Sequence, residues 1–310
     1  MNRFMYVFLK RWELGNFIGL KLSSGSPLSK QSQLAQLITY RDGVYSISPQ
    51  LAEIVEAVRD FVGCFILDAN VYEWIQNDQG YVLLRDTISH IKHIVPNVPI
   101  VVQDHRFHQT GFGVYGADLT LLNEYSSLRL DDILSKLGQD EGVGVPCLTY
   151  NSVFNQKQCE IITLTLSQLQ GVFSPGFVSQ LSAELLAKLG WQKLSGDSFC
   201  LPAYHLTLLQ LEKMYESGNQ LFLYTVAGSV SEVESLKILA PTVPVFLSLV
   251  GQVASDEFIR SAVNAMLPDR SGFILNDAGG FVDEWNKSGD LEATKRRLTV
   301  FRSFINEPQL

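Results

Sequence analysis

The sequence has little charge, few cysteines and no long apolar run, and each shortage excludes a class of protein. Charged residues make up 18% of the chain and apolar residues 46%, whereas an average soluble domain carries about 25% charged residues. This balance excludes intrinsic disorder, which requires low hydrophobicity and high net charge. The chain contains no run of about 18 apolar residues, so no membrane span is expected.

The cysteines and the excess of acidic residues narrow the range of partners. The four cysteines stand far apart, without a CxxC pair or a zinc-like Cys/His spacing, which predicts free thiols in a reducing compartment and no metal site. The net charge of −8 argues against nucleic acid, because duplex binding needs concentrated Lys and Arg. A small anionic ligand remains compatible, since backbone N–H groups can hold phosphate. Residues 1–14 are interrupted by charge and lack the features of a signal peptide, so we predict a cytoplasmic protein.

Short apolar runs rich in β-branched residues alternate with longer amphipathic stretches. Most of these runs are continuous rather than alternating, which is the pattern of parallel strands buried on both faces. Strands are therefore predicted at 17–22, 64–68, 100–104, 118–122, 143–149, 221–226, 245–249 and 272–276.

Helical patterns fill most of the intervals between these strands. Helices are predicted at 49–62, 80–94, 128–137, 231–239, 255–266 and 291–305 from apolar residues at three- and four-residue spacing. Eight strands, most of them followed by a helix, predict an α/β fold, a single (β/α)8 TIM barrel spanning residues 1–310. Such barrels typically have about 250 residues. We assign the excess to an insertion at 152–218, between strands five and six.

Polar residues gather where the predicted strands end, which is where barrels of this kind place their chemistry. Each residue could contact a ligand or could belong to a solvated rim. Two glycines, Gly251 and Gly279, follow strands seven and eight, where such barrels often bind phosphate. The other strand-end candidates are Lys21, Asp68, Asn123, Thr149, Asn151, Thr225, Gln252 and Asn276.

The densest group of functional side chains follows strand three. Asp104 and Arg106 would point the same way on an extended chain, so they could form a structural ion pair or face a ligand together. His105 and His108 titrate near neutral pH and could act as general acid or base, or could simply be solvated. Gln109 closes the group. No carboxylate set matches the histidines as metal ligands, and no cofactor is predicted.

Six stretches share residues and spacing with one known family: NVYE at 70–73, VPIVVQDHRFHQTG at 98–111, ADLTLLNEY at 117–125, Thr149 with Asn151, LKILAPTVPVFLSLVGQ at 236–252 and GFILNDAGG at 272–280. These stretches resemble the orotidine 5′-phosphate decarboxylase family, particularly its longer bacterial branch. The resemblance implies a (β/α)8 barrel that dimerises with its active sites at the interface. It also implies a pyrimidine nucleotide as ligand, with decarboxylation of orotidine monophosphate to UMP and no cofactor.

The reaction centre that the resemblance implies is altered in this sequence. The family uses a Lys–Asp–Lys–Asp array that includes a DxKxxD motif, of which only the first Asp is matched, by Asp104. Arg106 replaces the proton-donating lysine, and Gln109 replaces the Asp that crosses the dimer interface. The other replacements are Lys21 for the Asp of strand one, Ile66 for the Lys of strand two and Gly279 for the Arg that binds phosphate.

These replacements leave three hypotheses open. Arginine stays protonated above a pH of about 12, so it is a poor proton donor, and glutamine carries no charge. The first hypothesis is therefore a decarboxylase homologue whose activity is lost or strongly reduced. The second is an enzyme of altered chemistry on a small phosphorylated ligand. The third is a non-catalytic barrel that binds a ligand or a partner through the insertion at 152–218.

Overall fold

The computed structural model describes residues 3–22, 38–41, 44–69, 72, 79–103, 116–123, 130–148, 157–172, 181–218, 220–249, 256–266, 273–277 and 290–306. Eight parallel strands follow one another in a closed barrel in the order β1-β13-β12-β11-β7-β6-β5-β4, which confirms the predicted fold class. The strands are β1 (Ile18–Lys21), β4 (Cys64–Asp68), β5 (Ile100–Gln103), β6 (Leu119–Leu121), β7 (Gly142–Pro146), β11 (Leu221–Ala227), β12 (Val245–Leu249) and β13 (Phe273–Asp277).

Continuous apolar sequence explains why these segments form the barrel. The side chains of β4 and β5 are fully buried up to the last residue of each strand, as expected for parallel strands covered on both faces. Gly144 in β7 shows how closely the strands approach, because a Cβ atom at this position would overlap Leu121 Cδ2 of the neighbouring β6.

The helices of the barrel lie close to their predicted positions. Ser48 caps α3 by accepting a hydrogen bond from the Gln50 amide at 3.3 Å, and Ser229 and Glu232 form a capping box at the start of α13. Among the described helices, none is both long enough and apolar enough to cross a bilayer. The helices with predicted counterparts are α3 (Pro49–Val58), α5 (Gln79–Ile94), α7 (Leu130–Leu134), α13 (Val230–Leu239), α14 (Asp256–Met266) and α16 (Leu291–Asn306).

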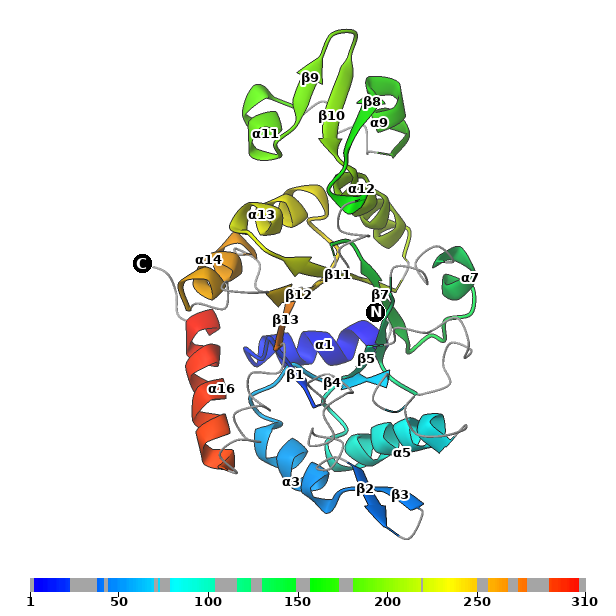
Figure 1. The fold of residues 1–310 in the computed structure, drawn as a ribbon, viewed down its shortest axis with the longest axis vertical. Coiled ribbons are helices and arrows are strands. Elements are labelled where there is room, and N and C mark those ends of the chain that lie inside the picture. Colours follow the sequence, from blue (N-terminus) through cyan, green and yellow to red (C-terminus); the bar gives the residue numbers. More distant parts are fainter. Residues whose placement is uncertain are drawn as a thin grey trace. The chain divides into compact units, whose positions relative to one another are not determined.

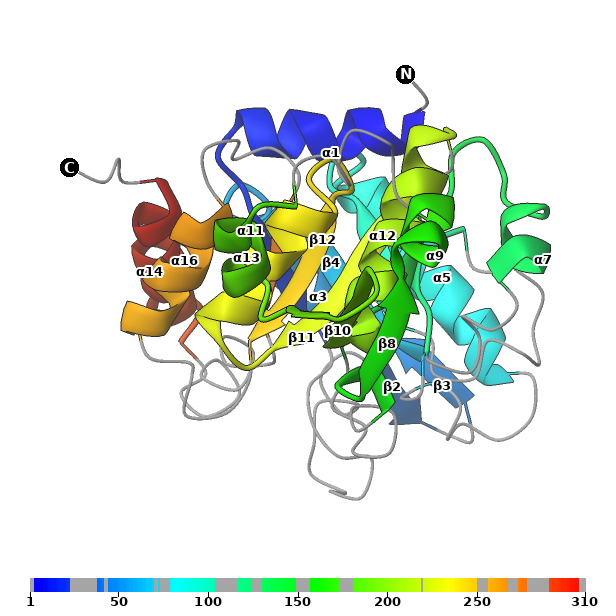
Figure 2. The same ribbon diagram turned by 90° about the horizontal axis from the view of Figure 1, so that it is seen from above.

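The chain divides into two compact units, one formed by Met1–Gly144 with Phe273–Leu310 and the other by Val145–Gly272. The first contains α1 (Arg3–Glu13), which was not predicted. Figure 2 shows α1 lying across the ends at which the strands of this unit begin. Its buried Arg11 donates a hydrogen bond from Nε to the Val62 carbonyl at 3.0 Å, directly before β4.

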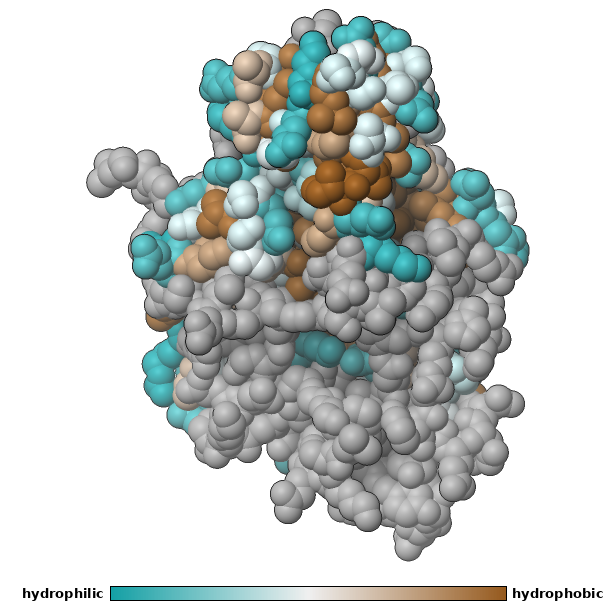
Figure 3. Space-filling view, turned by 45° about the horizontal axis from the view of Figure 1, so that its top comes forward, coloured by the Kyte–Doolittle hydropathy of each residue, from teal (hydrophilic) through white to brown (hydrophobic). Residues whose placement is uncertain are grey.

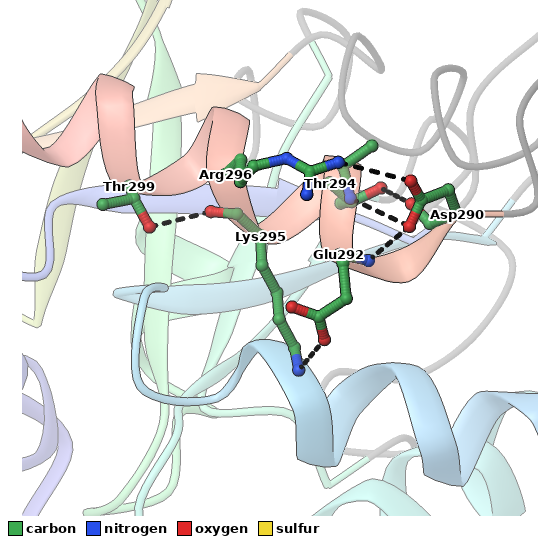
Figure 4. A network of polar contacts seen from close by, with 7 residues as sticks. Asp290, Glu292, Thr294, Lys295, Arg296 and Thr299 are labelled. Carbon is green, nitrogen blue, oxygen red and sulfur yellow. Dashed lines mark hydrogen bonds and ion pairs between the residues drawn. The ribbon is translucent and has the colours of Figure 1, made fainter.

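Helix α16 is the last described element of the first unit, and hydrogen bonds fix it at both of its ends. At its start, Asp290 Oδ1 accepts hydrogen bonds from the Glu292 and Ala293 amides at 2.9 and 3.1 Å, as Figure 4 shows for the labelled residues around Asp290. Near its other end, Arg302 Nη2 donates to the Leu14 carbonyl at 2.5 Å. A hairpin of β2 (Ile38–Arg41) and β3 (Val44–Ile47), also not predicted, completes the described elements of this unit.

In the second unit, the chain between β7 and β11 forms an antiparallel sheet and several helices (Figure 1). The sheet has the order β8-β10-β9. The buried rings of Trp191 and Phe199, the latter in β10, pack with their centroids 6.5 Å apart. The elements are β8 (Ile161–Thr165), α9 (Leu166–Val172), α11 (Ala183–Lys188), β9 (Gln192–Leu194), β10 (Ser198–Pro202) and α12 (Ala203–Glu216).

Candidate functional site

Three polar side chains meet at the carboxyl ends of the first three barrel strands. Lys21, Asp68 and Gln103 are the last residues of β1, β4 and β5. The ammonium nitrogen of Lys21 lies 3.0 Å from Asp68 Oδ2 and 3.2 Å from Gln103 Oε1. Two of the three ammonium N–H groups therefore bond to described side chains, and the cluster combines one cation, one carboxylate and one amide.

The strand register explains how these residues come together. Lys21 is level with Ile66, and Asp68 is level with Gln103, in the parallel ladders that β4 forms with its two neighbours. Because side chains alternate along a strand, Ile66 and Asp68 face the same way. The Lys21 side chain therefore extends two residues further along β4, past the apolar Ile66, to Asp68 at the end of the strand.

The Lys21–Asp68 ion pair is partly shielded from water. The two side chains keep 17% and 16% of their accessible surface, so their attraction is stronger than that of an exposed pair, which is worth about 0–1 kcal/mol. Each group nevertheless retains contact with solvent and, by the same opening, access to a ligand. Such a pair can donate a hydrogen bond through the ammonium group and accept one through the carboxylate.

A buried tyrosine lies close to this cluster. Tyr72, the only residue between 70 and 78 that the structure describes, is 1% exposed. Burial raises the pKa of its phenol to about 12, and the Asp68 carboxylate adds to the shift. The phenol is therefore neutral at physiological pH.

Asn123 and Asn276 lie near the carboxyl ends of β6 (Leu119–Leu121) and β13 (Phe273–Asp277). Asn123 follows β6 and is 7% exposed. Asn276 lies in β13, level with Gly19 of β1. Thr225, in contrast, lies within β11 and is fully buried, so the prediction that it lines the rim is wrong.

The remaining predicted site residues lie outside the described residues, so their roles stay predictions. Within the described part of the chain, no group of three or more His, Cys, Asp and Glu side chains is placed to hold a metal ion. The residues concerned are Asp104, His105, Arg106, His108, Gln109, Thr149, Asn151, Gly251, Gln252 and Gly279.

Gln103 begins the dense polar stretch around strand three but was not predicted as a site residue. The predicted strand ended at 104, one residue further along, so Gln103 was expected inside the strand. The available signal was its polarity, because it is the first polar residue after three buried apolar ones in β5.

Comparisons with known proteins establish the fold. No family model matches the chain, and no curated protein matches it by sequence. The solved OMP decarboxylase of Leishmania donovani is similar over 97% of this chain and 99% of its own, with a TM-score of 0.61 and 14% identity. The UMP synthase of the same organism is similar over 98% of this chain and 57% of its own, with a TM-score of 0.64 and 16% identity.

The chain therefore has an α/β barrel like that of the OMP decarboxylases. The same architecture also relates it to the tryptophan synthase alpha chain of Legionella pneumophila, which is similar over 99% of this chain and 98% of its own. That likeness has a TM-score of 0.51 and 12% identity. Since one barrel fold supports many chemistries, function has to be argued from the site.

Proposed function

We propose that this protein is an orotidine 5′-phosphate decarboxylase-like barrel that binds a pyrimidine nucleotide and has lost decarboxylation or retains very little of it. The observation that carries the proposal is the Lys21–Asp68–Gln103 cluster at the carboxyl ends of the first three strands. The cluster lies at the strand ends, where barrels of this kind carry their chemistry, and the sequence lacks the alternating lysines and aspartates that the resemblance implies.

The charges of the cluster are arranged unfavourably for that reaction. Lys21 stands where the resemblance places an aspartate, and its charge is matched by Asp68 at 3.0 Å. Ile66 stands where the resemblance places a lysine, and it is apolar and fully buried. A nearly neutral cluster cannot exert the electrostatic stress that crowded carboxylates place on a departing carboxylate. Arg106 and Gln109, known from sequence alone, would weaken proton donation further.

The cluster still suits the recognition of a polar heterocycle. The ammonium group offers a donor and the carboxylate an acceptor side by side, so a ring with adjacent C=O and N–H groups would find complementary partners. Gly251 and Gly279 are the proposed phosphate-binding positions. The proposal includes no cofactor and a homodimer with its sites at the interface, as the resemblance implies.

An enzyme of altered chemistry on a small phosphorylated ligand is the second candidate. It is favoured by the Lys21–Asp68 pair itself, because an ammonium group beside a carboxylate can serve as an acid–base couple. The sequence adds Asp104, His105, Arg106 and His108 as further candidates after strand three.

Calorimetry with UMP and its 6-hydroxy analogue tests nucleotide binding, and turnover of orotidine monophosphate tests the reaction. The informative variant is Lys21→Met. The matched control is Lys92→Met, because Lys92 forms an ion pair of similar length, 2.9 Å, with Asp118 at the amino-terminal end of β6.

We expect Lys21→Met to weaken binding of the 6-hydroxy analogue by about 10-fold or more, the usual effect of losing a charge-assisted hydrogen bond. Lys92→Met should bind like the wild type. Failure of the wild type to bind either nucleotide would refute the proposed ligand. Rapid UMP formation would refute the loss of decarboxylation. Turnover of another phosphorylated compound that disappears in Asp68→Asn would favour the second candidate.

A further inference from the structure

The antiparallel sheet of the second unit has an open edge at β8. Leu166 donates to the Asp197 carbonyl at 2.8 Å, and Ala203 donates to the Glu160 carbonyl at 2.9 Å. These bonds mark the two ends of the ladder between β8 and β10. Because bonded pairs alternate along an antiparallel ladder, the peptide groups at 161, 163 and 165 face away from β10.

One end of this edge is already closed. The Thr165 amide donates to Gln168 Oε1 of α9 at 2.8 Å. The backbone groups of Ile161 and Thr163 have no hydrogen-bond partner within the described segments. Ile161 is 62% exposed, and the Thr163 side chain is also exposed. Among the described residues, the free edge therefore consists of two residues whose peptide groups carry no hydrogen bond.

The side chains around this edge carry no charge. Residues 161–165 read IITLT, and the paired residues on the same face of β10 and β9 are also uncharged. Figure 3 shows apolar and hydrophilic residues side by side on this part of the surface. On the opposite face of the sheet, Phe199 and Leu201 of β10 are buried. The exposed face consists of Ile161, Thr163, Thr165, Gln192, Leu194, Ser198, Cys200 and Pro202.

An edge of this kind is unusual for a strand that remains single. Natural edge strands are protected by charged side chains, proline or a bulge, because open peptide groups and apolar side chains invite pairing with another strand. The β8 strand has none of these within Ile161–Thr165. The edge at β8 therefore lacks the protection that natural edge strands carry.

We propose that β8 pairs with β8 of a second copy of this chain. The two strands run antiparallel about a two-fold axis beside Ile162, so that Ile161 of each copy lies opposite Thr163 of the other. This register uses the two open positions and leaves the Thr165–Gln168 bond intact. It forms four backbone hydrogen bonds, two for each Ile161–Thr163 pair, and joins the two sheets into one.

Self-pairing is favoured over another partner by symmetry and charge. The two-fold axis places Ile161 of one copy opposite Thr163 of the other, and Thr163 of the first opposite Ile161 of the second. The same two residues thus form both halves of the contact, as an isologous interface requires. The nearest charged residue, Glu160, would lie opposite Leu164, roughly 14 Å from its own copy given a rise of about 3.4 Å per residue. That separation exceeds the Debye length of about 8 Å at physiological ionic strength, so like charges do not oppose the contact. Ile–Thr pairs across strands are also favourable.

A designed disulfide tests the register directly. In the proposed pairing Ile162 faces its own copy in a non-hydrogen-bonded pair, with Cα atoms about 4.5 Å apart, which lies within disulfide range. The Ile162→Cys variant, in a Cys159→Ser background that removes the exposed native thiol, should form a covalent dimer on mild oxidation. Ile161→Cys in the same background is the control, because its Cα atoms would be roughly 8 Å apart. Equal cross-linking of both variants, or none in Ile162→Cys, would overturn the proposal.

The molar mass in solution provides a second and independent test. Thr163→Pro removes one inter-chain donor from each copy, and Ile161→Lys places charge on the edge, so light scattering should show a lower molar mass for each variant than for the wild type. This expectation holds beside the homodimer of the proposed function, because β8 pairing would join such dimers into larger assemblies. Leu194→Lys, on the opposite edge of the same sheet, should keep the wild-type mass. A mass that is unchanged in both β8 variants, or lowered in Leu194→Lys as well, would contradict edge pairing. Nucleotide binding is unaffected in either case, so failure here is distinct from failure of the proposed ligand site.

Discussion

A buried histidine in the second unit gives the sharpest test of the structure. Trp191 Nε1 donates a hydrogen bond to His205 Nδ1 at 2.7 Å, which ties the segment before β9 to α12. The Tyr204 ring lies edge-on at 4.2 Å, and His205 is only 1% exposed. Indole N–H is only a donor, so Nδ1 must be the unprotonated nitrogen. Burial lowers the pKa of His205 to about 3.

This shift has a defined consequence for stability. The unfolded chain takes up a proton on this histidine near its ordinary pKa of about 6.5, whereas the folded chain does so only near 3. Unfolding therefore binds a proton between these values, and stability falls as the pH drops through that window. At pH 5 the loss from this one group is about 2 kcal/mol relative to pH 7.5. Above pH 7 it contributes no pH dependence.

Urea unfolding followed by tryptophan fluorescence at pH 7.5 and pH 5.0 measures the effect. Between these pH values, the wild type should lose about 2 kcal/mol more of its unfolding free energy than His205→Gln, which cannot titrate. His93→Gln, at an exposed position of α5, should keep the wild-type pH dependence. Equal pH dependence in the wild type and His205→Gln would refute the reasoning, as would a wild type more stable at pH 5.0.

Two further predictions concern the packing of the first unit. Gly63→Ala should destabilise the protein by about 1–3 kcal/mol in the same urea assay, because the new Cβ would lie 2.6 Å from the Asn16 carbonyl oxygen. In the control Gly171→Ala the new Cβ meets nothing within 4 Å, so this variant should be neutral or slightly stabilising. Equal losses of unfolding free energy in the two variants would contradict the packing around Gly63. Asp118→Ala should lower the unfolding free energy by about 2 kcal/mol or more, because Asp118 accepts hydrogen bonds from the Ile100 amide at 2.8 Å and from the ammonium group of a lysine in α5. The control Asp132→Ala removes an exposed ion pair and should lower the unfolding free energy by well under 1 kcal/mol.

The barrel strands could be predicted because burial on both faces leaves a clear sequence signal. The β4 strand was predicted with its observed bounds, since its apolar run ends in Asp68. The β8 strand was missed, because its residues alternate between exposed and half-buried positions and give no continuous apolar run. Helix α1 was missed for a related reason. Its charged residues interrupt the apolar pattern in sequence, although Arg11 is buried by bonding to backbone carbonyls.

For the candidate site, the sequence could predict which residues lie at strand ends but not which of them pair with one another. Lys21 and Asp68 were predicted as strand-end residues, and both lie at strand ends. Their pairing depends on the stagger between β1 and β4, which sets Lys21 level with Ile66 and lets it reach Asp68. Nothing local to either segment specifies that stagger. The single-domain organisation and the bounds 152–218 of the insertion likewise stay predictions.

The division of the first unit into two segments has a consequence for the order in which the chain folds during synthesis. Strand β1 pairs with β4 on one side and with β13 on the other. Its second neighbour thus leaves the ribosome only after the whole of Val145–Gly272 has been made. The later-made second unit is continuous in sequence and can complete its folding while the first still exposes one flank of β1. A pause in translation before Phe273 would prolong the lifetime of that unfinished edge, and chaperone demand should concentrate there.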